Sequence, residues 1–253
     1  MLVDWTPLRH ALADMRHAGV TLPIWWRDDD AVAPSVPLDR LHALATELDL
    51  PAHIAVIPDL AETVLAETVK TRAHLIPLIH GWRHENNAAA GAKKSEFGAY
   101  DPQIAIHIHA AKTRMDSLFD RNYLPIFVPP WNRFDPAYVL DLRDAGYRGL
   151  STFLPRTDQW AGPGVVQINT HIDPIDWRGT RGLVDPMALI KHTIQLLRAR
   201  REGRADATEP LGFLTHHLVH DEDLWDFSRQ FLSELLQGGA HAQPLAPLLE
   251  PPV

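Results

Sequence analysis

Short apolar segments alternate along the chain with longer segments in which apolar residues recur at helical spacing. About seven of the short segments lack strict polar alternation, which is typical of strands that are buried on both faces. The predicted strands are residues 22–27, 52–58, 74–79, 124–128, 148–153, 164–169 and 211–217.

The longer segments between these strands predict helices over residues 6–19, 37–50, 60–73, 101–122, 135–146, 186–201 and 222–238. In the first of them we expect Thr6 as the N-cap, Pro7 at the first helical position and an end at Gly19.

Strand candidates that alternate with helices are typical of parallel βαβ units. We therefore predict an α/β fold with a closed or nearly closed distorted barrel of about seven strands, and an open doubly wound sheet is the alternative. No internal repeat or linker divides residues 1–253, so we expect a single domain. The loop over residues 85–101 is either an active-site lid or a solvated loop, and the proline-rich tail at about 241–253 is expected to be an extended surface arm or disordered.

The composition of the chain limits the metal ligands, binding partners and cellular location that we expect. The 253 residues include no cysteine, so a metal would have to be held by nitrogen and oxygen ligands. A formal charge of −8 argues against nucleic-acid or anionic-membrane partners and favours a neutral or cationic substrate. The first residues do not resemble a signal peptide, and no apolar segment approaches the length of a membrane span, so we expect a cytoplasmic protein. The oligomeric state is left open.

Polar clusters follow several predicted strands, where functional groups of parallel α/β folds collect. They are RDDD (27–30), HGWRH (80–84), VPPWNR (128–133), DPIDW (173–177) and LTHHLVHD (214–221). Three consecutive aspartates repel one another and need a cation or several hydrogen-bond donors, or else form a solvated turn with Arg27 as a partner. His80 and His84 stand four residues apart, so on one helical turn both rings would point the same way.

The two histidines and one carboxylate of the aspartate triplet would form a two-nitrogen, one-oxygen metal site with places left for water. Zinc is the first expectation for this divalent metal, and ferrous iron can be held by a similar set. Without such a metal, histidines at this spacing are solvated surface residues. His107 and His109 point in different directions on a helix, and we do not include them in the site.

Taken in order, the clusters resemble the five motifs of the polysaccharide deacetylase family, also called NodB-homology carbohydrate esterases. The first family motif, Thr-Phe-Asp-Asp-Gly, resembles RDDDA. This resemblance implies Asp29 as the catalytic base and Asp30 as a metal ligand, and Asp28 is the alternative if the motif is shifted by one residue. The second motif, His-(Ser/Thr)-x-x-His, resembles HGWRH and implies His80 and His84 as metal ligands.

The third motif, Arg-x-Pro-Tyr, resembles VPPWN, with Pro130 and Trp131 matched but Val128 where the family has the arginine that orients the base. The fourth motif resembles DPIDW and implies that Asp176 and Trp177 orient the base or bind substrate. Without the family arginine, Arg133 or Arg27 is the expected partner of Asp176.

The fifth motif, Leu-x-His-Asp, resembles LTHH, which implies Leu214 as a pocket wall and His216 as the general acid. His217 replaces the family aspartate and is the reserve candidate. Since His216 and His217 are adjacent on a strand, they are expected to point to opposite sides, with at most one facing the active site.

The motifs span residues 27–217. Together they imply a distorted barrel and the metal-dependent hydrolysis of an N-acetyl or similar amide on an amino sugar or glycan precursor. The alternatives are the same chemistry on a small cytosolic amide or a carrier-linked sugar, a non-catalytic relative that binds metal or glycan, and a ferrous oxygenase. The last is disfavoured because such enzymes usually have double-sheet folds.

Overall fold

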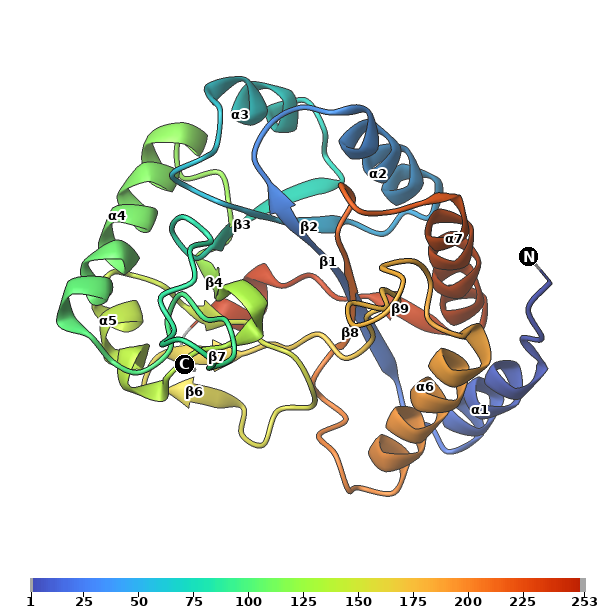
Figure 1. Ribbon diagram of the computed structural model, residues 1–253. Coiled ribbons are helices and arrows are strands. Elements are labelled where there is room, and N and C mark those ends of the chain that lie inside the picture. The colour runs from blue at the N-terminus through green and yellow to red at the C-terminus, as the bar shows by residue number, and fades with distance from the viewer. Residues whose placement is uncertain (1, 251–253) are drawn as a thin grey trace.

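The computed structural model describes residues 2–250. Seven helices surround one mixed sheet (Figure 1). The helices are α1 (Thr6–His17), α2 (Val36–Glu47), α3 (Thr63–Lys70), α4 (Pro102–Phe119), α5 (Val139–Asp144), α6 (Pro186–Arg201) and α7 (Glu222–Gln237), with short 3-10 helices η1 (Pro130–Asn132), η2 (Pro136–Tyr138) and η3 (Ala246–Leu249). The strands are β1 (Leu22–Ala31), β2 (Ala52–Val56), β3 (Leu75–His80), β4 (Ile126–Val128), β5 (Gly149–Leu150), β6 (Trp160–Gly162), β7 (Val165–Gln167), β8 (Leu211–Thr215) and β9 (Ala240–Ala242).

The strands run in the order β6-β7-β5-β4-β3-β2-β1-β8, and β9 pairs with β1. All pairings are parallel except that of β6 with β7. The segment after β7 bridges to β8 through Ile172 and Phe213, which closes a distorted ring. The predicted α/β class and distorted barrel are thus confirmed, and β6 and β9 are additions to the seven expected strands.

Alternate residues of strands β1 to β4 and β7 face two separate cores, because side chains on a strand point to opposite faces. Trp26 belongs to the large core between the sheet and the helices, which includes helix residues such as Leu8 and Leu41. Trp25 belongs to a smaller core inside the barrel. Apart from Leu245, the fully buried members of this inner core come from the strands or the residue directly after them.

The C-terminal segment was expected to be a surface arm or disordered. Instead, β9 extends the sheet beside β1, and Leu245 is 1% exposed within the inner core. Burial of this leucine removes apolar surface from water and ties the segment to the barrel. Residues 251–253 of the predicted tail lie outside the described residues.

The helix ends show how local sequence sets the loops. Ser35 and Asp221 accept hydrogen bonds from backbone N–H groups in the first turns of α2 and α7, as N-cap residues do. The expectation for α1 was off by one residue: Trp5 is its N-cap, and Asp4 rather than Thr6 supplies the accepting side chain, to the N–H of Thr6. Within residues 2–250, none of the helices combines the length and apolar character that crossing a membrane requires.

Candidate active site

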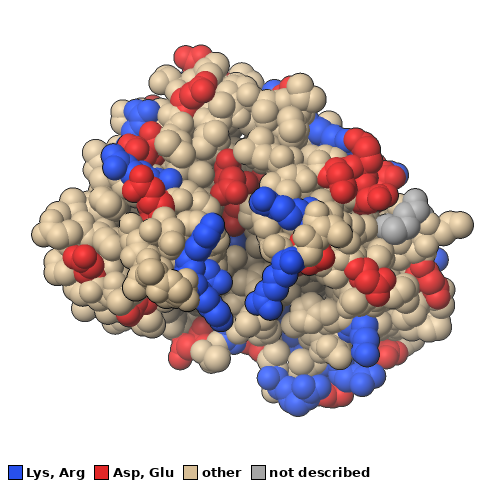
Figure 2. Space-filling view, viewed as in Figure 1, with Lys and Arg blue, Asp and Glu red and all other residues tan. Residues whose placement is uncertain are grey.

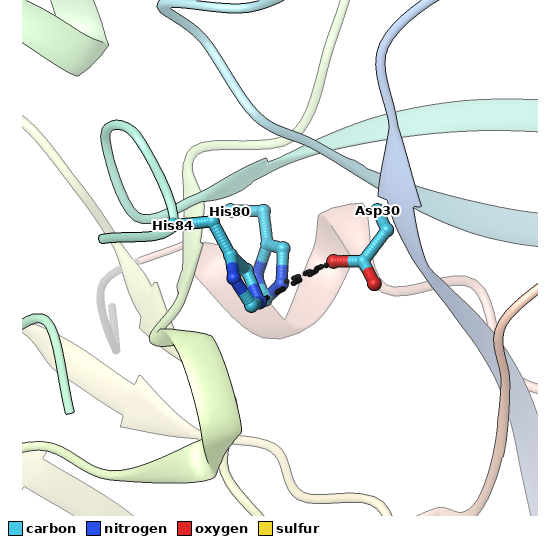
Figure 3. Close-up of side chains that lie close together, drawn as sticks. All are labelled: Asp30, His80 and His84. Atoms are coloured by element: carbon cyan, nitrogen blue, oxygen red, sulfur yellow. Dashed lines mark ion pairs between the residues drawn. The ribbon is translucent and has the colours of Figure 1, made fainter. Parts of the chain in front are cut away.

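Three side chains from two strand ends meet at one point (Figure 3). Asp30 lies near the end of β1, His80 is the last residue of β3, and His84 follows in the next loop. Asp30 Oδ1 is 3.2 Å from His80 Nε2 and 3.4 Å from His84 Nε2, and one ligand atom of each residue lies within 4.8 Å of the others. Parallel strands β1 and β3 flank β2, so their carboxyl ends open at the same edge of the barrel.

The two histidines are not on a helical turn, so that part of the sequence prediction is wrong. His80 ends a strand, and the loop reverses through positive φ at Gly81 (54°) and His84 (58°). The buried carboxylate of Glu96 accepts hydrogen bonds from the backbone N–H groups of Trp82, Arg83 and His84. A Cβ at Gly81 would clash with Glu96, so glycine and glutamate together fix this loop.

These donor atoms fit a divalent metal ion. His80 Nδ1 is 2.9 Å from the carbonyl oxygen of Val128, which fixes Nδ1 as the donor and leaves the Nε2 lone pair free for a cation. Asp30 Oδ1 is buried without a hydrogen-bond donor, although it faces both imidazoles. Burial opposes ionisation of Asp30, but the close approach of His80 Nε2 and the charges of the nearby histidines hold its pKa well below the usual range. Two imidazole nitrogens and a carboxylate form a set that zinc binds readily.

The aspartates at 28 and 29 point to opposite faces of β1. Asp29 lines a surface cleft together with His80 and His84, which form the donor triad with Asp30. Asp28 is fully buried on the other side, where Oδ1 lies 2.5 Å from His217 Nδ1 and Oδ2 accepts a hydrogen bond of 2.6 Å from Thr215. Burial disfavours both charges, but the Asp28 carboxylate raises the pKa of His217. The two reserve candidates therefore contact each other outside the cleft.

Arg27 is the partner of Asp29. Its Nε lies 2.9 Å from Oδ1, and Nη2 donates to Oδ2 at 3.0 Å, with both side chains almost completely buried. Arg27 also donates to Ser151 Oγ (2.8 Å) and Asn132 Oδ1 (2.6 Å). Val128, where the resembled motif has arginine, is buried in the inner core. Arg27, two residues before Asp29 on β1, therefore makes the contact with Asp29 that an arginine at position 128 would make in the resembled motif.

Asp176 has a different role from the expected one. Its carboxylate accepts hydrogen bonds from the N–H groups of Gly179 (3.0 Å) and Thr180 (3.3 Å), so it shapes its own loop and contacts neither Arg27 nor Arg133. Asp173 faces the cleft instead. Burial raises the pKa of Asp173, and its carboxylate accepts hydrogen bonds from the N–H of Ile175 and Trp177 Nε1.

The residues meet in a cleft of about 660 Å³, a volume typical of small-molecule sites. It is lined by Asp29, His80, His84, Trp131, Asn132, Arg133, Phe153, Leu154, Asp173, Ile175, Trp177, Arg178 and His216. His216 Nε2 is 3.9 Å from Asp29 Oδ2, and the Trp177 ring meets the His216 ring edge-on at 4.7 Å. Pro130 and Leu214 are buried behind the wall, Pro130 close to Gly81.

Some residues of this site were not identified from the sequence. Glu96 lies in the loop over residues 85–101, and its burial with Phe97 shows that this part of the loop is anchored rather than solvated. Residues 89–94 are exposed. Nothing in the local sequence marks Glu96, because its role depends on the loop folding back onto residues 82–84. Asn132 and Ser151, which hold Arg27, were missed for the same reason.

No protein-family model matches the chain, and no curated protein matches its sequence. Solved structures with the same fold do match. A protein from Mycobacterium smegmatis described as a polysaccharide deacetylase aligns at a TM-score of 0.65 and 15% identity, over 91% of this chain and 90% of that one. A CE4 esterase from Streptococcus mutans aligns at 0.59 and 11% identity, over 92% and 89%.

A CE4-family pseudoenzyme from Bacillus anthracis also aligns, with a TM-score of 0.57 and 13% identity, over 91% of this chain and 66% of that one. The structural similarity therefore extends to a protein described as a deacetylase, to an esterase and to a pseudoenzyme. At these identities it shows that the chain has the polysaccharide deacetylase fold.

Proposed function

We propose that this chain belongs to the polysaccharide deacetylase family and is a metal-dependent hydrolase that removes an N-acetyl or similar acyl group from an amino sugar or glycan precursor. One observation carries the proposal: two members of the donor triad, His80 and His84, line the same cleft as His216 and as Asp29, which is paired with Arg27. The fold shared with family 4 carbohydrate esterases supports the same reaction class.

A zinc ion held by Asp30, His80 and His84 would polarise the acyl carbonyl and lower the pKa of water toward about 7. Asp29, held by Arg27, is placed to accept the proton of the attacking water. His216, whose Nε2 lies 3.9 Å from Asp29 Oδ2, would donate a proton to the leaving amine. Trp131 and Trp177 offer flat apolar faces on which a sugar ring can stack.

The absence of arginine at position 128 was the best sequence argument for a non-catalytic relative. Arg27 weakens that argument, because Asp29 keeps a buried guanidinium partner with two contacts of about hydrogen-bond length. An aspartate and arginine buried together cost desolvation energy, and replacing them by apolar residues is often neutral or stabilising. Their presence in the cleft therefore favours an active enzyme.

Metal analysis combined with acetate release from acetylated amino sugars tests the proposal. Zinc with acetate release supports it, zinc binding without turnover of any acylated substrate favours a binding protein, and iron with oxygen uptake indicates an oxygenase. His80→Ala and His84→Ala should each lower the metal content, whereas His109→Ala on the exposed face of α4 should not. Unchanged metal content in both site variants would remove these histidines from the proposed site.

Asp29→Asn separates catalysis from metal binding. We expect this variant to retain its metal but to lose about 100-fold or more of kcat, since a general base contributes about 10²–10⁴ to rate. Asp223→Asn, on the exposed surface of α7, is the matched control and should retain full activity. Normal turnover by the Asp29→Asn protein would show that another group is the base.

A further inference from the structure

The cleft has a basic rim although the chain carries a net charge of −8. Arg133 follows η1 on one wall, and Arg178 belongs to the loop between β7 and α6 on another. Figure 2 shows Lys and Arg side chains on both sides of the hollow at the centre of this face. Arg181, in the same loop as Arg178, lies over the Trp177 ring with its guanidinium carbon 5.5 Å from the ring centroid.

Within residues 2–250, neither Arg133, Arg178 nor Arg181 forms an ion pair with a carboxylate. Arg133 donates one hydrogen bond to the carbonyl oxygen of Lys94. A guanidinium has five N–H donors, so most of the donors of Arg133 are left for a ligand. By contrast, the exposed Arg83 outside the cleft is paired with Asp59 at 2.8 Å.

The acidic side chains at the cleft have partners other than the arginines of the rim. Asp29 is paired with Arg27, and Asp30 faces the two histidines of the donor triad. The Asp173 carboxylate accepts hydrogen bonds from Ile175 and Trp177. The carboxylates of the cleft are therefore engaged with other groups, and none of them forms an ion pair with Arg133 or Arg178 at the rim.

The loop that carries Arg178 and Arg181 is held in one shape. Asp176 caps the backbone N–H groups of Gly179 and Thr180, and a Cβ at Gly179 would clash with the Asp176 carboxylate. A loop fixed in this way presents its arginines with less loss of conformational entropy on binding than a mobile loop would.

We propose that the substrate carries an anionic group, a carboxylate or a phosphate, which Arg178 and Arg133 bind while the acyl amide lies at the donor triad. This inference rests on the proposed amidase function and specifies its substrate class. Arginine suits the role because its planar donors match carboxylate and phosphate oxygens in pairs. It replaces the expectation, drawn from net charge alone, of a neutral or cationic substrate.

Three acetylated sugars test this inference: neutral N-acetylglucosamine, its 6-phosphate, and N-acetylmuramic acid, which bears a carboxylate. Their dissociation constants are measured by calorimetry on zinc-loaded Asp29→Asn protein, and kcat/KM for acetate release is measured on the zinc-loaded wild type. We expect at least one anionic sugar to bind about tenfold or more tightly than the neutral one, because it gains charge-assisted hydrogen bonds that the neutral sugar lacks. Whether the phosphate or the carboxylate is preferred identifies the source of the charge.

The preference should shrink when salt is raised from about 0.05 M to about 0.5 M, because exposed charges are screened. It should fall in Arg178→Gln and Arg133→Gln, be kept only in part in Arg178→Lys, which retains the charge but not the paired planar donors, and be unchanged in Arg198→Gln, an exposed arginine on α6 outside the cleft. Neutral and anionic sugars that bind equally, or a preference that both glutamine variants retain, would overturn the inference and mean that these arginines are merely solvated.

Failure of the two proposals can be distinguished. Selective binding of anionic sugars without acetate release would contradict the hydrolase function and leave the anion site intact. Acetate release that is equally fast from neutral and anionic sugars would contradict the anion site and leave the hydrolase function intact.

Discussion

Replacing Arg27 with methionine tests the most unusual contact of the site. Arg27 is fully buried, and its guanidinium contacts Asp29, Ser151 and Asn132. Methionine keeps much of the length of the side chain but removes the charge and all donors. The Asp29 side chain, only 4% exposed, would then be a buried carboxylate without its cationic partner.

The expected cost follows from this burial. Removing one partner of a buried ion pair destabilises a protein by about 3–5 kcal/mol, because the remaining charge is left uncompensated. Such a loss is a large share of the about 5–15 kcal/mol by which domains are usually stable. Adding Asp29→Asn to the Arg27→Met protein removes that charge and should recover part of the loss, giving a coupling energy of about 1–3 kcal/mol.

Urea unfolding of wild type, both single variants and the double variant, followed by tryptophan fluorescence and circular dichroism, measures this coupling. Equal urea dependence in all four proteins is the control that the unfolding transition itself has not changed. If Arg27→Met costs the same free energy with aspartate or asparagine at position 29, the pair contributes no coupling and our account of Asp29 is wrong.

Three further changes follow from the structure. Gly81→Ser restores the hydroxyl residue of the resembled motif, but its Cβ would clash with Glu96, so we expect about 1–3 kcal/mol lower stability and weaker metal binding; normal metal affinity would contradict this. Burial lowers the pKa of His53 to about 4. Below about pH 6.5 the unfolded chain therefore binds a proton at this histidine that the folded protein does not bind until about pH 4. The contribution of His53 to stability should therefore fall by about 3 kcal/mol as pH drops from 6.5 to 4, so that urea unfolding at each pH should show a shallower fall in His53→Asn than in the wild type. Leu245→Ala should cost about 2–5 kcal/mol of unfolding free energy, whereas the exposed Leu218→Ala should cost little, and equal costs would refute the inner-core position of Leu245.

Periodicity was sufficient to predict the order of helices and strands, because buried parallel strands have continuous apolar segments. It also placed the polar clusters at strand ends, and one carboxylate of the aspartate triplet lies with His80 and His84 as the pattern indicated. That this carboxylate is Asp30 was implied only by the family resemblance. The alternation of a strand could have shown that Arg27 and Asp29 share a face, since residues two apart point the same way. That signal was present in the sequence, but Arg27 was considered only as a partner of the triplet in a solvated turn or as one of two partners of Asp176.

Other features depend on contacts between distant segments and leave no local pattern. The contribution of Glu96 requires its loop to fold back over residues 82–84. The helical turn expected for His80 and His84 failed because strand β3 continues to His80 and the chain then reverses at a glycine. The spacing of two histidines fixed their proximity but not the backbone that achieves it.

The position of Arg27 has a consequence for how the cleft can vary. Because the arginine and Asp29 are two residues apart on one extended segment, the geometry of β1 itself aligns them. An arginine at position 128, as in the resembled motif, would instead make this alignment depend on how two separate strands pack. With the contact built into one strand, substitutions at position 128 can accumulate during evolution without separating Arg27 from Asp29, whereas Asn132, which accepts a hydrogen bond from Arg27, ties the segment after β4 to the pair.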